Sequence, residues 1–166
     1  MGETTRLFLA LWPDAGVRDA LAARRDAWTW PAGTAPVADA KLHLTLHFLG
    51  SQPSERLPDF LDGFAVPFSP FRVELGKPVL WPHGIAVLEP LEPPAELLHL
   101  HRTLSAAVTS LGLVTEPRQY RPHVTMARRA ARATVAAPAA PLRWDVDGYA
   151  LVESRGGTYT VLRTYA

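Results

Sequence analysis

The chain has 166 residues, of which 48% are hydrophobic, and its formal net charge is +1. A near-neutral charge does not indicate a bulk polyanion binder, because domains that coat nucleic acid carry a large positive excess. Cysteine is absent, which excludes disulfides, thiolate metal ligands and thiol nucleophiles. The apolar run near the N-terminus is too short for a signal peptide, and none approaches the roughly 20 residues of a membrane span. We therefore expect a soluble, cytoplasmic protein.

Hydrophobic periodicity predicts strands and helices in alternation along the first half of the chain. Residues 6–12 read as a buried strand, and Asp14 is placed to cap a following helix. A strand over about residues 42–49 comes after a loop rich in Pro, Gly and Ala. Ser54 is then expected to cap a second, short helix.

The second half contains the clearest helix, within residues 93–112, where leucines and a valine repeat at helical spacing. The other segments are two strands at 71–81 and 84–90, a strand around 121–128, a low-complexity loop or lid at 129–141, and closing strands at 143–166. Short connections and Gly/Pro turns favour an α+β fold with mostly antiparallel sheets over a doubly wound parallel one.

The stretch KLHLTLHFLG, residues 41–50, alternates apolar and polar side chains. On a strand, residues i and i+2 point the same way, so His43, Thr45 and His47 are expected to share the face opposite the leucines. An ordinary soluble strand would carry Lys, Glu or Ser there. Two imidazoles and a hydroxyl on one face of a strand indicate a functional site.

A second His-x-Thr, His123 with Thr125, occurs in a predicted strand 80 residues later. A third, which begins at His101, lies in the strong helix, where i and i+2 diverge by about 200°; we expect His99 and His101 to be solvated. The two strand copies each follow a helix in matching halves of the chain. This arrangement predicts one domain, residues 1–166, with two pseudo-symmetric lobes of mostly antiparallel sheet, flanked by helices around a central cleft.

Two facing imidazoles suit acid–base chemistry at a phosphodiester. With an unperturbed pKa of about 6.5, one ring can be neutral and the other protonated near pH 7. The neutral ring takes a proton from the attacking oxygen, and the charged ring protonates the leaving oxygen. Hydroxyls of Thr45 and Thr125 can donate to nonbridging phosphate oxygens, and Arg128 can carry part of the negative charge. Opening a cyclic phosphate needs this set and no metal.

Other sites fit the sequence less well. A zinc site that uses His43 and His47 would require them adjacent, yet four strand residues span roughly 13 Å. The chain has no His-Glu-x-x-His, Gly-x-Ser-x-Gly or Gly-rich phosphate loop. A lone histidine would more simply be a hydrogen-bonded residue at the core edge, but a matched pair with the same neighbour argues against that reading. We expect no metal and no cofactor.

At this point the chain resembles the two-histidine phosphoesterases, specifically the bacterial and archaeal RNA 2′,3′-cyclic phosphodiesterases, also called 2′-5′ RNA ligases. The motif KLHLTLHFLG is similar to the family's first motif, YRPHVTMAR to its second, and RLFLALWPD and the closing strands to its ends. The resemblance implies catalytic His43 and His123, phosphate-binding Thr45, Thr125 and Arg128, and a two-lobed α+β fold. Met126 where Leu is usual, and the Ala/Arg/Pro-rich residues after Arg128, depart from the pattern.

The resemblance further implies hydrolysis of a 2′,3′-cyclic phosphate at an RNA end or on a nucleotide to a 2′-phosphate, with weak 2′-5′ ligation in reverse. We expect a monomer whose partner is that RNA end or nucleotide. His47 is read as either a contact to a ribose or flanking phosphate or a rim residue, and Tyr120, with Trp12 and Trp81, as either base-stacking or core. The alternatives are a noncatalytic RNA-end or nucleotide-binding module, and a phosphodiesterase for another cyclic phosphate such as an ADP-ribose derivative.

Overall fold

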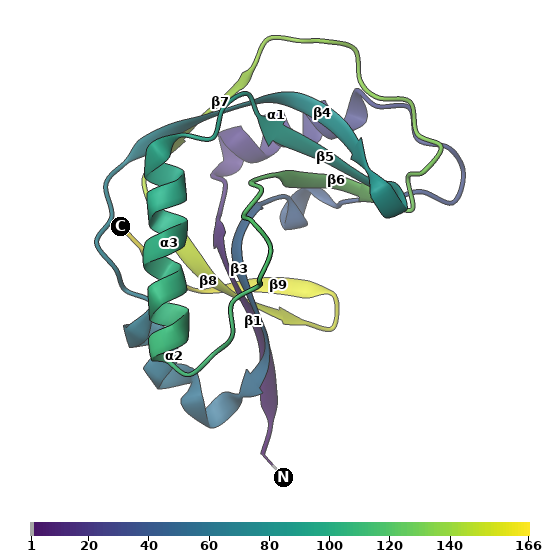
Figure 1. Cartoon of the computed structure of the whole chain (residues 1–166). Helices are drawn as coiled ribbons and strands as arrows, with labels where there is room; N and C mark the ends of the chain where they lie inside the picture. Colours follow the sequence, from purple (N-terminus) through teal and green to yellow (C-terminus); the bar gives the residue numbers. More distant parts are fainter. Residues whose placement is uncertain (1) are drawn as a thin grey trace.

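The computed structural model describes residues 2–166, in which strands and helices are interleaved (Figure 1). In chain order the elements are β1 (Thr4–Leu11), α1 (Ala15–Asp26), β2 (Ala35–Pro36), η1 (Asp39–Lys41), β3 (Leu44–Pro53), η2 (Ser54–Arg56), α2 (Leu57–Gly63), β4 (Phe71–Trp81), η3 (Pro82–Gly84), β5 (Ile85–Pro90), α3 (Ala95–Ser110), β6 (Val124–Arg128), β7 (Leu142–Val146), β8 (Tyr149–Arg155) and β9 (Thr158–Tyr165). Here η marks short 3₁₀ turns. The predicted segments all correspond to elements, with boundaries shifted by a few residues.

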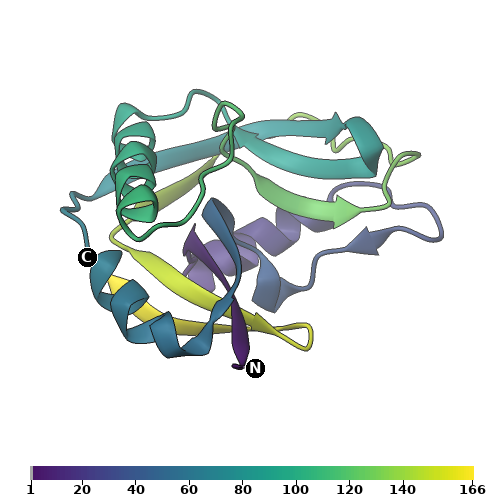
Figure 2. The same cartoon turned by 60° about the horizontal axis from the view of Figure 1, so that its bottom comes forward.

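The strands form one sheet in the order β7-β4-β5-β6-β3-β1-β8-β9, with β2 added beside β6. Every neighbouring pair is antiparallel. β3 and β6 meet through one residue pair, Leu44 with Val124, so the sheet separates there into a lobe of β4–β7 and a lobe of β1, β3, β8 and β9. Figures 1 and 2 show these lobes as two layers of arrows. The expectation of an α+β fold with mostly antiparallel strands is confirmed.

One hydrophobic core joins the two lobes. Leu7, Leu9 and Leu11 point into it from alternate positions of β1, and each is at most 1% exposed. α3 contributes its buried stripe, which includes Leu100 and Leu104, and packs against β3. Because a fully buried Leu contributes roughly 2 kcal/mol, this shared core fixes the position of β3 relative to the rest of the protein.

Turn and cap residues mostly do what their chemistry predicts. The carboxylate of Asp14 accepts a hydrogen bond from the Val17 N–H at 2.8 Å and so caps α1. Gly156 and Gly157 have φ of 56° and 79°, the left-handed conformation that a two-residue hairpin turn requires between β8 and β9. The cap predicted at Ser54 is wrong: its hydroxyl has no partner within residues 2–166, and a 3₁₀ turn precedes α2 instead.

Residues 129–141 form an irregular segment that is tied by backbone hydrogen bonds to the loop after α1 and to η3. Thr134 pairs with Thr29 near the end of α1, and the N–H of Ala130 donates to the carbonyl of Gly84 at 2.8 Å. The segment is therefore a tethered loop in this structure.

Within the described residues, no helix has the length and apolar character needed to cross a membrane.

Candidate active site

The two predicted histidines lie at the junction of the lobes. His43 is the residue before β3, and His123 is the residue before β6. Their following neighbours, Leu44 and Val124, form the one residue pair between these strands and are both fully buried. Since side chains alternate along a strand, the histidines point to the other face, toward the cleft between the lobes.

The register of β3 with β6 also determines where the two threonines lie relative to the histidines. In an antiparallel pair the residues on either side of Leu44 and Val124 face each other crosswise. Thr45 therefore lies opposite His123, and Thr125 lies opposite His43, so that each ring has a hydroxyl from the other motif nearby. The two motifs together form one pseudo-symmetric polar patch, as the sequence predicted.

Backbone carbonyls fix the tautomer of both rings in the same way. Nδ1 of His43 lies 2.6 Å from the carbonyl oxygen of Lys41, and Nδ1 of His123 lies 2.8 Å from that of Arg121. A carbonyl can only accept, so each Nδ1 carries a hydrogen, and each neutral ring presents a lone pair at Nε2. Nε2 of His43 is 2.9 Å from Oγ1 of Thr45.

Aromatic side chains hold each imidazole in place. Trp12 stacks on His43 with ring centroids 5.7 Å apart, and Tyr159 meets the same ring edge-on at 5.6 Å. Trp81 packs against His123 at 4.3 Å. Each predicted catalytic ring thus has one tryptophan in contact with it, and this contact is consistent with the partial burial of both tryptophans.

Burial shifts the titration of both histidines. The pKa of His43 is lowered to about 4, chiefly by desolvation and also by the nearby charges of His123 and Arg128, against the raising effect of the Lys41 carbonyl. Burial also lowers the pKa of His123, where the carbonyl of Arg121 and the carboxylate of Glu89 act in the opposite sense. Without a phosphate in the cleft both rings are therefore neutral at pH 7. A bound anion would favour the protonated form.

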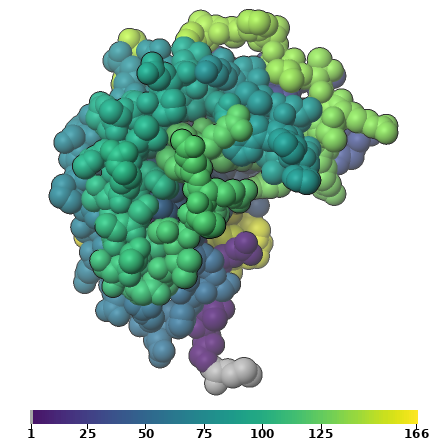
Figure 3. Space-filling model, viewed as in Figure 1, coloured from purple at the N-terminus to yellow at the C-terminus, as the bar shows by residue number. Residues whose placement is uncertain are grey.

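Arg128, at the end of β6, completes the group. It is exposed, lines a cavity beside the site, and its charge acts on both imidazoles. The space-filling view shows the molecule hollowed between the lobe of β4–β6 and the β8–β9 hairpin (Figure 3). The five side chains predicted to act on a phosphate are thus brought to one place.

The prediction that His47 continues the face of His43 and Thr45 is wrong. The pairing of β3 with β1 shifts at Leu46: Ala10 pairs with Thr45, but Leu9 pairs with His47. The extra residue of this bulge reverses the alternation. His47 therefore turns toward the core side, where it is 7% exposed and its Nε2–H donates to the carbonyl of His101 at 3.0 Å.

His101 and Tyr120 also differ from their predicted surroundings. His101 is not a solvated helix residue, because its ring is stacked between His47 at 4.1 Å and Tyr120 at 3.8 Å. The Tyr120 hydroxyl donates to the carbonyl of Thr45 at 2.8 Å, and burial raises the pKa of this phenol. Tyr120 thus supports the strand that carries Thr45 and does not line the cavity. His99 is exposed, as expected.

The sequence pattern did not identify two residues of the cleft, Phe48 and Arg6. The bulge that buries His47 brings Phe48 onto the cleft side, where it is 58% exposed and lines the cavity with Arg6. Strict alternation along β3 would place Phe48 on the core face with Leu44 and Leu46, so its exposure becomes visible only once the bulge is known.

Among residues 2–166, no three His, Asp or Glu side chains lie together in a way that could hold a metal ion.

Comparison with known proteins gives consistent matches over most of the chain. A family model described as the 2′-5′ RNA ligase superfamily matches residues 17–158. The chain is 36% identical to the RNA 2′,3′-cyclic phosphodiesterase of Thermus thermophilus, over 97% of this chain and 89% of that protein. It is 32% identical to the Escherichia coli protein of the same name, over 100% and 98%.

The fold agrees with these relatives. The crystal structure of E. coli LigT complexed with 3′-AMP superposes with a TM-score of 0.87 at 27% identity and covers 99% of this chain and 98% of that one. Both the sequence matches and the structural match extend over both His-x-Thr motifs. The chain therefore belongs to the 2′-5′ RNA ligase superfamily, and its full-length relatives carry the name RNA 2′,3′-cyclic phosphodiesterase.

Proposed function

We propose that the protein hydrolyses 2′,3′-cyclic phosphates at RNA ends or on nucleotides to 2′-phosphates, without a metal ion, by paired histidine acid–base catalysis. The observation that carries this proposal is the matched geometry of His43 and His123. Each donates Nδ1–H to the carbonyl two residues earlier, which turns its Nε2 to the shared cleft beside Arg128. The names of the full-length relatives support the same substrate class.

In this mechanism water attacks phosphorus in line with the departing O3′, so the base and the acid must stand on opposite sides of the phosphate. One histidine from each lobe meets that requirement. The base removes a proton from water as the new P–O bond forms, and the acid gives its proton to O3′ as the P–O3′ bond breaks. The products are a 2′-phosphate and a free 3′-hydroxyl. A 5′-hydroxyl in place of water would give a 2′-5′ linkage instead.

His123 is assigned as the base and His43 as the acid. Within residues 2–166, Nε2 of His123 has no hydrogen-bond partner, so its lone pair is open to a water molecule. Nε2 of His43 contacts Thr45, whose hydroxyl can donate to the neutral ring or accept from the protonated one. The negative charge of a bound phosphate favours protonation of His43 despite its burial.

The nonbridging oxygens of the phosphate accept hydrogen bonds from Arg128, Thr45 and Thr125. A guanidinium offers several N–H donors in one plane and can contact two phosphate oxygens at once. Because the transition state carries more negative charge on these oxygens than the substrate does, donors fixed at this place lower the barrier and not only the binding energy.

The test is product analysis on a short RNA of defined sequence that carries a 2′,3′-cyclic phosphate. The proposal predicts one product, the 2′-phosphate, formed without added metal. A 3′-phosphate product would contradict the geometry of attack, and binding without turnover would indicate a noncatalytic end-binding module. Turnover confined to a cyclic phosphate on an ADP-ribose derivative would refute the RNA-end assignment.

A further inference from the structure

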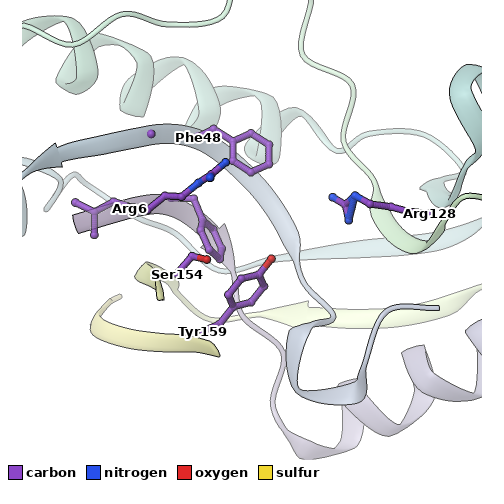
Figure 4. A pocket seen from close by; sticks show the side chains of 8 residues that line it. Arg6, Phe48, Arg128, Ser154 and Tyr159 are labelled. Carbon is purple, nitrogen blue, oxygen red and sulfur yellow. The ribbon is translucent and has the colours of Figure 1, made fainter. Parts of the chain in front are cut away.

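Beside the histidines lies a cavity of about 260 Å³ whose lining side chains, apart from Arg128, have no part in the proposed catalytic chemistry. It is lined by Arg6, Leu7, Phe8, Phe48, Gly50, Arg128, Ser154 and Tyr159. Figure 4 shows Arg6 beside the ring of Phe48, Arg128 facing them from the opposite side, and the Tyr159 hydroxyl directed into the space between. These side chains come from β1, β3, β6, β8 and β9.

The cavity is continuous with the reacting site. The ring of Phe8 lies 4.8 Å from that of His43 and 6.3 Å from that of Phe48, so an aromatic floor runs from the catalytic imidazole into the cavity. Arg128 belongs to both places. Arg6 lies two residues before Phe8 on β1, which is about 7 Å farther along the strand.

The cavity offers both an unpaired positive charge and an open aromatic face. Arg6 is exposed, and within residues 2–166 no carboxylate lies within ion-pair distance of it. Ser154, its cross-strand neighbour on β8, adds a hydroxyl on the same lining. Phe48 exposes more than half of its surface, although aromatic side chains are normally buried. A phosphate and a base are the ligand groups that match this combination.

We propose that this cavity binds the RNA immediately 5′ of the reacting nucleoside: Arg6 and Ser154 hold the phosphate on that side, and Phe48 stacks against the adjoining base. The inference rests on the function proposed above and extends it from the cyclic phosphate to the strand that carries it. The enzyme should then prefer RNA ends over free nucleoside cyclic phosphates as substrates, because a free nucleoside cyclic phosphate lacks the groups that the cavity binds.

The experiment compares kcat/KM for a nucleoside 2′,3′-cyclic phosphate with kcat/KM for the same nucleoside at the 3′ end of a dinucleotide. A charge-assisted phosphate contact predicts that the wild type prefers the dinucleotide by roughly tenfold or more. Arg6→Gln should reduce this ratio by roughly tenfold and weaken its dependence on salt. Phe48→Ala should reduce the ratio by roughly tenfold.

Matched controls come from exposed positions away from the cavity. Arg102→Gln on α3 removes a charge, and Val114→Ala removes an exposed apolar side chain; both should keep the wild-type ratio. A wild-type ratio near one, or an unchanged ratio in Arg6→Gln, would overturn the subsite while turnover of the nucleoside substrate still supported the proposed function. Absence of turnover on both substrates would refute the proposed function and the subsite with it.

Discussion

The burial of both imidazoles predicts a specific pH dependence. The rate should follow a bell, since one ring must be neutral and the other protonated. The kcat/KM profile reports the free enzyme, in which burial lowers the pKa of His43 to about 4 and also lowers that of His123. The active form with one proton therefore lies below the ordinary imidazole range, and the kcat/KM maximum should fall on the acidic side of about 6.5.

The kcat profile should peak at higher pH, because it reports the complex with substrate. One negative charge about 4 Å away is worth about 4 kcal/mol at an effective dielectric of 20, or about 3 pKa units. That is comparable to the drop of the His43 pKa from 6.5 to about 4. A bound phosphate thus returns the imidazoles to the neutral range, and kcat should be maximal at about pH 6–7.5.

The assay is steady-state turnover of a cyclic phosphate between about pH 4.5 and 9, with kcat and kcat/KM fitted separately. Arg128→Gln should move the acidic limb of kcat/KM to higher pH, since the Arg128 charge disfavours protonation of both rings, whereas Arg102→Gln should leave that limb unchanged. A flat profile, or a rate that rises steadily to pH 9, would refute the two-imidazole assignment.

Three further predictions follow from particular contacts. Arg128→Lys should lower turnover by roughly tenfold or more, because an ammonium keeps the charge but not the planar donor set; turnover close to wild type would argue against a nonbridging-oxygen role. Activity should persist in EDTA, and its loss with recovery in Zn²⁺, Mn²⁺ or Mg²⁺ would contradict the metal-free mechanism. His47→Ala should reduce the free energy of unfolding by about 2 kcal/mol, since it removes a buried hydrogen-bonded ring, whereas His99→Ala at an exposed site should change it little; equal denaturation midpoints for these two variants would contradict this structural role.

Local pattern predicted much of this fold because its elements are regular. The alternation of β4 and β5 and the apolar stripe of α3 gave elements within a few residues of those observed. The His43 and His123 motifs could be paired because each directly precedes a strand. The tautomers could not be predicted, since they depend on the backbone carbonyls of Lys41 and Arg121.

What the sequence did not reveal comes from irregular backbone and from tertiary contacts. The bulge at Leu46 exchanges the expected places of His47 and Phe48, and no residue type in that stretch marks a bulge. The stacking of His101 on Tyr120 joins α3 to the segment before β6, and helical spacing alone contains no sign of it. The lowered pKa of His43 likewise depends on burial that only the assembled lobes produce.

The central claim is that His43 and His123 act as opposed acid and base. It is tested most directly by single-turnover rates of His43→Ala and His123→Ala on an RNA 2′,3′-cyclic phosphate and on its analogue with sulfur in place of O3′. Each variant should lose about 10²-fold or more on the oxygen substrate. Because a thiolate leaves without protonation, His43→Ala should recover most of its rate on the sulfur substrate, and His123→Ala should not. Near wild-type turnover of the oxygen substrate by either variant would contradict the account.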